Sequence, residues 1–258
     1  MSGCARHDNV CGRCDKPLDF DFTMAFQPLV DVASDRIYGY EALVRGTAGE
    51  SAFSVLSRVD ETTLYRFDQA CRVRAIEMAD GLGANALLSI NFLPNAVYEP
   101  QACIQATLET AERVGWPTDR LCFEITETES VRDRRHLKNI VESYRAMGLQ
   151  VALDDFGTGH ANLDLLIDIS PDVLKLDRQL ISGIPQSPRQ QIIVDQIISL
   201  AERLEIKLVA EGVETLEEAR WLYRRGITRQ QGYWYARPIT EQLPCCPDGR
   251  FALVRGEH

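Results

Sequence analysis

Eight short apolar runs, most of them separated by segments with helical spacing, constrain the fold of this chain more than any other feature. The runs are rich in β-branched and aromatic residues, which favour strands. They occupy residues 25–30, 38–44, 87–92, 121–126, 150–155, 173–177, 207–211 and 232–236. Strands that alternate with helices along most of a chain predict an α/β fold, here a (β/α)8 barrel of the TIM type.

Three of the separating segments carry apolar residues three or four positions apart, as an amphipathic helix does. They cover residues 64–78, 137–144 and 193–204, and Gly81 and Gly148 follow the first two as stop signals. The connection from Val30 to Tyr38 is too short for a crossover helix. We therefore expect a hairpin there and a first strand that runs antiparallel to the rest.

The chain has 258 residues, a length at which α/β barrels commonly form one domain. We expect a cysteine-rich leader over residues 1–20, one barrel domain over residues 21–245 and a C-terminal tail over residues 246–258. No secretory signal is visible, and no apolar run approaches the ~18 residues of a membrane helix. These features predict a soluble, cytoplasmic protein.

The formal net charge of −10 argues against broad binding to DNA, RNA or an anionic membrane surface. It leaves a phosphate-bearing substrate open, because bound Mg²⁺ or Mn²⁺ reverses the local sign of the charge. Eight cysteines in a cytoplasmic chain indicate free thiols, and Cys71, Cys103 and Cys122 lie within apolar patterns typical of a core.

Carboxylates stand where several of the predicted strands end. In such a barrel the carboxyl ends of the strands meet at one face, where chemistry takes place. An acid at a strand end is by itself more often a helix cap or a surface charge. Many acids buried together without cations are costly, and divalent ions remove that cost. The polar residues near these strand ends are Glu41, Asn91, Glu124, Glu127, Asp154, Asp155, Lys175, Asp177, Glu211, Glu214 and Gln231.

The run Asp154-Asp155-Phe156-Gly157-Thr158-Gly159 is the sharpest local signal. Neighbouring residues of a regular strand point to opposite faces, so both aspartates cannot bind metal from regular strand geometry. A turn that begins here, helped by two glycines, can redirect the second aspartate. One carboxylate would then bridge two metal ions while its neighbour binds only one. The alternative is an aspartate-rich turn before a helix.

These motifs together resemble the EAL domain family, the cyclic di-GMP phosphodiesterases. The name motif stands as Glu41-Ala42-Leu43, after Gln27-Pro28 and before Arg45. Further matches follow in family order over roughly residues 22–240. They are Asn91, Glu124-Ile125-Thr126-Glu127, the paired-aspartate run, Lys175-Leu176-Asp177, Ala210-Glu211-Gly212-Val213-Glu214 and Gln231-Gly232-Tyr233.

The resemblance implies a (β/α)8 barrel with an antiparallel first strand and a cyclic-guanylate-specific phosphodiesterase. The reaction would open one phosphodiester of cyclic di-GMP to give linear pGpG, with two Mg²⁺ or Mn²⁺ ions in each active site. It also implies a homodimer, formed through helices near the paired-aspartate loop.

Site residues carry over by position. The resemblance implies that one metal is held by Glu41, Asn91, Glu124 and Asp154. Asp154 would bridge to a second metal held by Asp155 and by Glu211, directly or through water. Lys175 would orient or deprotonate the attacking water. Glu214 and Gln231 would support these groups, and Glu127 would brace the loop after Asp155 and couple it to dimerisation.

Four further positions match residues that contact guanine or phosphate in the family: Gln27, Leu43, Arg45 and Asp177. For Arg45 a surface ion pair is the alternative. The chain departs from the family pattern at Gly46, Leu93 and His160-Ala161-Asn162. None of these is a proposed metal ligand, so they bear on substrate affinity and on loop coupling more than on chemistry.

The leader carries Cys4, His7, Cys11 and Cys14, which could bind zinc, act as a redox switch or be incidental thiols of a flexible segment. For the domain itself, a silent cyclic di-GMP receptor or a protein-interaction module is the alternative to an enzyme. Such domains usually lack several of the acids. Because every carboxylate position is filled here, the sequence favours an active enzyme.

Overall fold

The computed structural model describes residues 18–97, 99–126, 133–157 and 162–256. It also gives the backbone of a short antiparallel pair, β1 (Arg6–His7) and β2 (Val10–Cys11). The side chains of Cys4, His7, Cys11 and Cys14 lie outside the described residues, as do Glu127, His160 and Ala161. The interpretations placed on them stay predictions.

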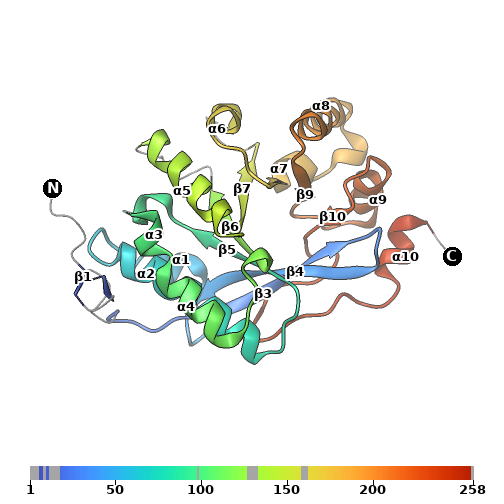
Figure 1. Ribbon diagram of the computed structural model, residues 1–258. Coiled ribbons are helices and arrows are strands. Elements are labelled where there is room, and N and C mark those ends of the chain that lie inside the picture. Colours follow the sequence, from blue (N-terminus) through green and yellow to red (C-terminus); the bar gives the residue numbers. More distant parts are fainter. Residues whose placement is uncertain are drawn as a thin grey trace.

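Eight strands in the described part of the chain close into a barrel (Figure 1). They are β3 (Thr23–Asp31), β4 (Arg36–Arg45), β5 (Leu87–Phe92), β6 (Leu121–Thr126), β7 (Gln150–Phe156), β8 (Val173–Leu176), β9 (Lys207–Ala210) and β10 (Arg229–Gln230).

Strand β3 is antiparallel to both of its neighbours in the barrel, β4 and β10, and the pairs from β4 round to β10 are parallel. A short strand, β11 (Ile239–Thr240), pairs with the first half of β3. The predicted α/β barrel with an antiparallel first strand is confirmed. Its cause is local, because the short link between β3 and β4 leaves room only for a hairpin.

Helices surround the barrel (Figure 1). The longest are α2 (Leu64–Gly81), α5 (Arg134–Ala146) and α8 (Pro188–Leu204), and each contains one of the segments that showed helical spacing. Gly81 is the last residue of α2, not a stop beyond it. The others are α1 (Ala52–Leu56), α3 (Pro100–Cys103), α4 (Gln105–Val114), α6 (Asn162–Asp168), α7 (Arg178–Ile181), α9 (Leu216–Arg224), α10 (Arg250–Arg255) and the 3-10 turns η1 (Pro94–Ala96), η2 (Thr118–Arg120) and η3 (Ile184–Gln186).

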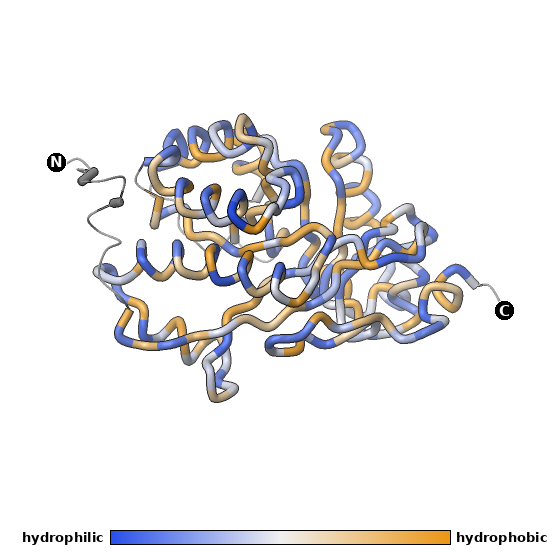
Figure 2. Tube along the Cα trace, turned by 60° about the horizontal axis from the view of Figure 1, so that its bottom comes forward, coloured by the Kyte–Doolittle hydropathy of each residue, from blue (hydrophilic) through white to orange (hydrophobic). Residues whose placement is uncertain are grey.

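Apolar side chains gather in two buried clusters. The larger lies between the strands and the surrounding helices. Its first members along the chain are Phe20 and Phe22, which pack on Phe67 of α2. Figure 2 shows the result, with mostly apolar strands through the middle and helices that alternate between polar and apolar residues. The smaller cluster, with Leu29 and Val209 among its members, belongs to the strands alone.

The described cysteines agree with the expectation of free thiols. Cys71 and Cys122 are buried, Cys103 is half-buried, and the cysteines whose side chains are described are free thiols. Among the helices described, none combines the length and the apolar character needed to cross a membrane.

The strand predicted at residues 232–236 is wrong. The last barrel strand is Arg229–Gln230, and residues 232–236 form a turn. The Trp234 N–H donates to the Val213 carbonyl, and a Cβ on Gly232 would lie 2.1 Å from that carbonyl oxygen. The aromatic residues that suggested a strand instead anchor the turn, because Tyr235 is buried and its hydroxyl donates to Gln230 Oε1 at 2.7 Å.

Candidate functional site

The inward side of the barrel carries a polar residue near the carboxyl end of each of five consecutive strands. These residues are Glu41 on β4, Asn91 on β5, Glu124 on β6, Asp154 on β7 and Lys175 on β8. Glu211 follows β9 directly. Parallel pairing places Asn91 beside Glu124. Strand alternation explains why these side chains share one face, and barrel closure brings them together.

Lys175 lies at the centre of this group. Its Nζ is 2.6 Å from Glu211 Oε1, 2.8 Å from Glu124 Oε1, 3.2 Å from Asp154 Oδ1 and 3.5 Å from Glu41 Oε2. Burial alone favours the neutral amine, but the surrounding carboxylates raise the pKa of Lys175 well above its usual value. One buried cation therefore faces four acids, which leaves negative charge for further cations to offset.

Burial and the excess of negative charge together affect the acids themselves, because they raise the pKa of two of them. Burial, reinforced by Glu41, raises the pKa of Glu124 well above its usual value. Burial, reinforced by Asp154, does the same to the pKa of Glu211. Glu124 Oε2 is buried and has no hydrogen-bond partner among the described residues. A buried carboxylate oxygen without a donor is costly, and a hard divalent cation would satisfy it.

Asp155 is turned out of regular strand geometry. Its φ is +55°, and the pairing of β7 with β8 shifts register between Leu153 and Phe156. Asp154, Asp155 and Glu211 each then offer a carboxylate oxygen within 4.8 Å of the others. Burial and the neighbouring Asp154 raise the pKa of Asp155 to about 6. Three acids this close repel one another, and their oxygens fit the ligand preference of Mg²⁺ or Mn²⁺.

Two amides hold Glu41 in place. Asn91 Nδ2 donates to Glu41 Oε1 at 3.1 Å, and Gln231 Nε2 donates to Glu41 Oε2 at 2.7 Å. The same Gln231 nitrogen is 3.2 Å from Gln27 Oε1. These neutral groups orient the carboxylate without adding to the repulsion among the acids.

A cleft of about 280 Å³ lies beside this cluster. Asp177 is at its edge and also caps α7, because its Oδ1 accepts from the Gln179 N–H at 2.6 Å. Glu214 is also at the edge and pairs with Arg178 Nη2 at 3.0 Å. The predicted site residues that line the cleft are Gln27, Glu41, Leu43, Asp177, Glu211, Glu214 and Gln231.

Arg45 does not line this cleft. Its Nη1 donates to the neighbouring Val44 carbonyl at 2.7 Å. Among the described residues it forms no surface ion pair, and its expected contact with guanine or phosphate stays a prediction. Two positions that depart from the family pattern have a structural explanation. Gly46 leaves space for the Glu50 side chain. The Leu93 N–H donates to Asp68 Oδ1 at 2.9 Å.

Two residues outside the predicted set position the site. Ser89 lies two residues before Asn91 on β5, so it shares the inward face, and its hydroxyl donates to Glu124 Oε1. Glu218 on α9 is buried and accepts the N–H groups of Gly183, Glu214 and Thr215 at 2.9 to 3.0 Å. The spacing of Thr215 and Glu218 forms a capping box, a signal present in the sequence.

The family model described as "EAL domain" matches residues 18–238. The chain belongs to the EAL domain family.

A standalone versatile EAL protein from Vibrio cholerae O395, solved with c-di-GMP bound, is 48% identical, with a TM-score of 0.88 over 91% of this chain and 99% of that one. BlrP1 from Klebsiella pneumoniae, in a manganese and cyclic-diGMP complex, is 33% identical, with a TM-score of 0.80 over 88% of this chain and 58% of that one.

A probable cyclic di-GMP phosphodiesterase of Escherichia coli K12, PdeN, is 33% identical over an alignment of 230 residues that covers 84% of this chain and 43% of PdeN. The chain spans roughly half or less of the length of the curated relatives that it matches most strongly.

Proposed function

We propose that this protein hydrolyses one phosphodiester of cyclic di-GMP to give linear pGpG, with two Mg²⁺ or Mn²⁺ ions in its active site. The observation that carries the proposal is the convergence of Asp154, Asp155 and Glu211 within 4.8 Å, beside a second group of buried acids around Lys175. The complexes of its relatives with cyclic di-GMP and manganese support the same substrate and the same kind of metal.

The donor set divides into two metal sites that share one residue. Glu41, Asn91, Glu124 and Asp154 would hold the first ion, and Asp154, Asp155 and Glu211 would hold the second. When bound, such ions lower the pKa of a water molecule and offset negative charge on the phosphodiester.

Lys175 acts on the attacking water through its Nζ. The amine lies between Glu211 and Glu124, at 2.6 Å and 2.8 Å, so a proton taken from water has a carboxylate within reach. The surrounding acids raise the pKa of Lys175, and divalent cations held by them would offset that negative charge. Lys175 would then orient the attacking water or take a proton from it.

The cleft beside the acids receives the nucleotide. Gln27, Leu43 and Asp177 present an amide, an apolar surface and a carboxylate to a guanine base, and Arg45 contacts phosphate from outside the cleft. Gln231 keeps Glu41 in position, and Glu214 keeps the segment after Glu211 in position. Glu127 braces the loop after Asp155.

The proposal includes a homodimer in the cytoplasm, with no nucleic-acid or membrane partner. Helix α6 follows the paired-aspartate loop and leaves Leu163 and Ile167 exposed, at 61% and 82% of their surface. Apolar side chains exposed this far favour a protein contact at that helix.

Product analysis tests the function directly. Purified protein incubated with cyclic di-GMP and Mn²⁺ or Mg²⁺ should produce pGpG, and EDTA should abolish it. Asp154→Asn should remove turnover while the protein stays folded. Intact substrate in every metal, with saturable cyclic di-GMP binding, would instead identify a receptor. Partner capture that survives Glu41→Ala, without nucleotide binding, would identify an interaction module.

A further inference from the structure

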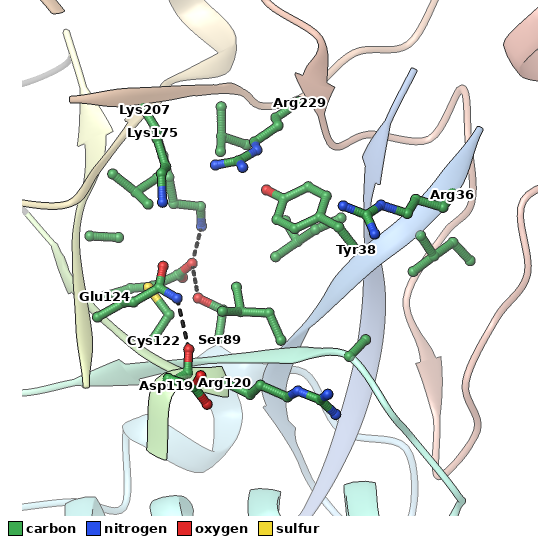
Figure 3. A pocket seen from close by; sticks show the side chains of 18 of the residues that line it. Arg36, Tyr38, Ser89, Asp119, Arg120, Cys122, Glu124, Lys175, Lys207 and Arg229 are labelled. Carbon is green, nitrogen blue, oxygen red and sulfur yellow. Dashed lines mark hydrogen bonds and ion pairs between the residues drawn. The ribbon is translucent and has the colours of Figure 1, made fainter. Parts of the chain in front are cut away.

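A second cavity, of about 340 Å³, opens at the end of the barrel opposite the acid cluster (Figure 3). Its wall comes from the first residues of the parallel strands, among them Leu87, Gln150 and Lys207. Ser89, Glu124 and Lys175 close its inner end, so the cavity reaches the underside of the metal cluster without sharing the nucleotide cleft.

Small side chains create this space. Each polar site residue on these strands is preceded, two positions earlier, by a residue on the same inward face. These earlier residues form a layer nearer the starts of the strands: Ser89, Cys122, Ala152, Val173 and Val209. A barrel of this type normally fills its interior layers with bulky branched side chains. Serine, cysteine and alanine in this layer leave a hollow that is unusual for the fold.

The mouth of the cavity is basic. Arg36, Arg120, Lys207 and Arg229 line it, and Asp119 is the acid beside them. The structure records no ion pair for these four cations within its described ranges. Four such cations stand out in a chain of net charge −10, and a positive mouth on a cavity attracts anions.

Three of the mouth cations, all arginines, contact neighbouring groups. The Arg36 Nε donates to Ser34 Oγ at 3.1 Å, and Arg120 donates to Asn85 Oδ1. Arg229 lies 5.2 Å from the centre of the Tyr38 ring and within electrostatic reach of Asp31. These contacts orient the guanidinium groups, and Arg36 and Arg120 keep further donors for a ligand.

The side walls of the interior are apolar, whereas Ser89, Glu124 and Lys175 at its inner end are polar. Leu29, Cys122, Ala152, Val173 and Val209 form one buried cluster, and Tyr38 packs at its edge. Figure 3 shows the Tyr38 hydroxyl pointing into the cavity. The volume lies at the lower end of the range for small-molecule pockets, which is ~300 to 1,000 Å³.

We propose that this cavity binds a small organic anion, with one phosphate or carboxylate head at the basic mouth and a compact apolar body inside the barrel. The cavity shares no lining residue with the cleft proposed for the nucleotide, so the two sites are separate.

Calorimetric titration with phenyl phosphate, in EDTA, tests this assignment. The wild-type protein should bind it saturably, and Lys207→Gln/Arg229→Gln should weaken binding ~10-fold or more, because two charge-assisted contacts are lost. Arg203→Gln/Arg224→Gln removes the same charge from exposed positions outside the cavity and should change the affinity less than ~2-fold. Benzoate in place of phenyl phosphate distinguishes a carboxylate head from a phosphate head.

A second variant tests the apolar interior. Ala152→Leu fills the hollow, so it should abolish phenyl phosphate binding while circular dichroism shows a folded protein. Absence of saturable binding of both phenyl phosphate and benzoate to the wild type would overturn the proposal. Equal affinity in the wild type and Lys207→Gln/Arg229→Gln would overturn it as well, even if Ala152→Leu fails to fold.

Discussion

At the scale of single residues, the site is a balance between one buried lysine and an excess of carboxylates. Lys175 contacts four acids, and Asp155 adds another carboxylate beside Asp154 and Glu211. Without divalent cations these acids destabilise the folded protein. The residues that make the chemistry possible therefore reduce the stability of the metal-free form.

Asp155→Asn should stabilise the metal-free protein at pH 7 by about 1 kcal/mol, a value reduced for the partial exposure of this side chain. The pKa of Asp155 is raised to about 6 in the fold, above its ordinary value of 3.8. The unfolded chain therefore ionises first, and the folded state loses stability as pH rises from about 4 to about 6.

Urea unfolding in EDTA at pH 4 and pH 7 measures this effect. The gain from Asp155→Asn should shrink at the lower pH, and Mn²⁺ should stabilise the wild type more than the variant. Asp80→Asn, at an exposed position on α2, is the matched control. A gain from Asp155→Asn that is the same at pH 4 and at pH 7 would contradict the assigned repulsion.

Lys175→Met should lower kcat by about 100-fold or more, the range for loss of a general acid or base. The Kd for cyclic di-GMP, measured in Ca²⁺, should change far less, because Lys175 does not line the cleft. Steady-state kinetics in Mn²⁺ gives the first value and calorimetry the second. An unchanged kcat would remove Lys175 from the mechanism.

At the scale of elements, the segment between β9 and α9 is held by a single buried side chain. Glu218 accepts three backbone N–H groups, two from residues 214 and 215 and one from Gly183 beside η3. This segment also carries Glu211 at its start. The capping box of α9 therefore stabilises the start of that helix and also the segment that carries Glu211, a proposed metal ligand.

Glu218→Ala should cost about 3 kcal/mol in unfolding free energy, because three buried donors lose their acceptor. Turnover should fall as well, because the segment that follows Glu211 loosens. Urea unfolding and kinetics in Mn²⁺ measure the two effects. Glu217→Ala, at the exposed neighbouring position, should change both little. Equal behaviour of the two variants would show that the capping box does not support the site.

At the scale of the whole molecule, the barrel is closed by segments from both ends of the described chain. Helix α10 packs on α9 with Val254 buried, Phe251 stacks on Tyr235, and Arg255 pairs with Asp35 at the start of β4. Residues 246–258, expected from the sequence as a tail, thus include a helix that contacts the barrel.

Deletion of residues 250–258 should lower the unfolding free energy by about 3 kcal/mol, because Val254 and Phe251 lose buried apolar contacts. Urea unfolding compares the shortened and full chains. Leu253→Ala, at a position 42% exposed, should have a much smaller effect in the full chain. A shortened chain as stable as the full one would contradict this contribution of α10.

Much of the fold and of the candidate site was predictable because it rests on local pattern. The bounds of β5 and β6 follow from apolar runs, the hairpin of β3 from a short link, and the inward face of Glu124 and Asp154 from strand alternation. The turn that redirects Asp155 follows from the glycine after Phe156. The EAL motifs found in the sequence agree with the match over residues 18–238.

Only the tertiary structure determined which distant residues meet. The strand-end pattern predicted Lys175 near the acids, but only the structure brings its Nζ within 3.5 Å of four of them. The sequence could not place Glu218 under the segment after Glu211 or Gly232 against Val213. It also gave no sign that small residues on three strands leave a cavity with a basic mouth. The physical reason is the separation along the chain of the residues that interact. Strand period and turn geometry depend on neighbouring residues, whereas these contacts depend on barrel closure, which brings together side chains far apart in the sequence.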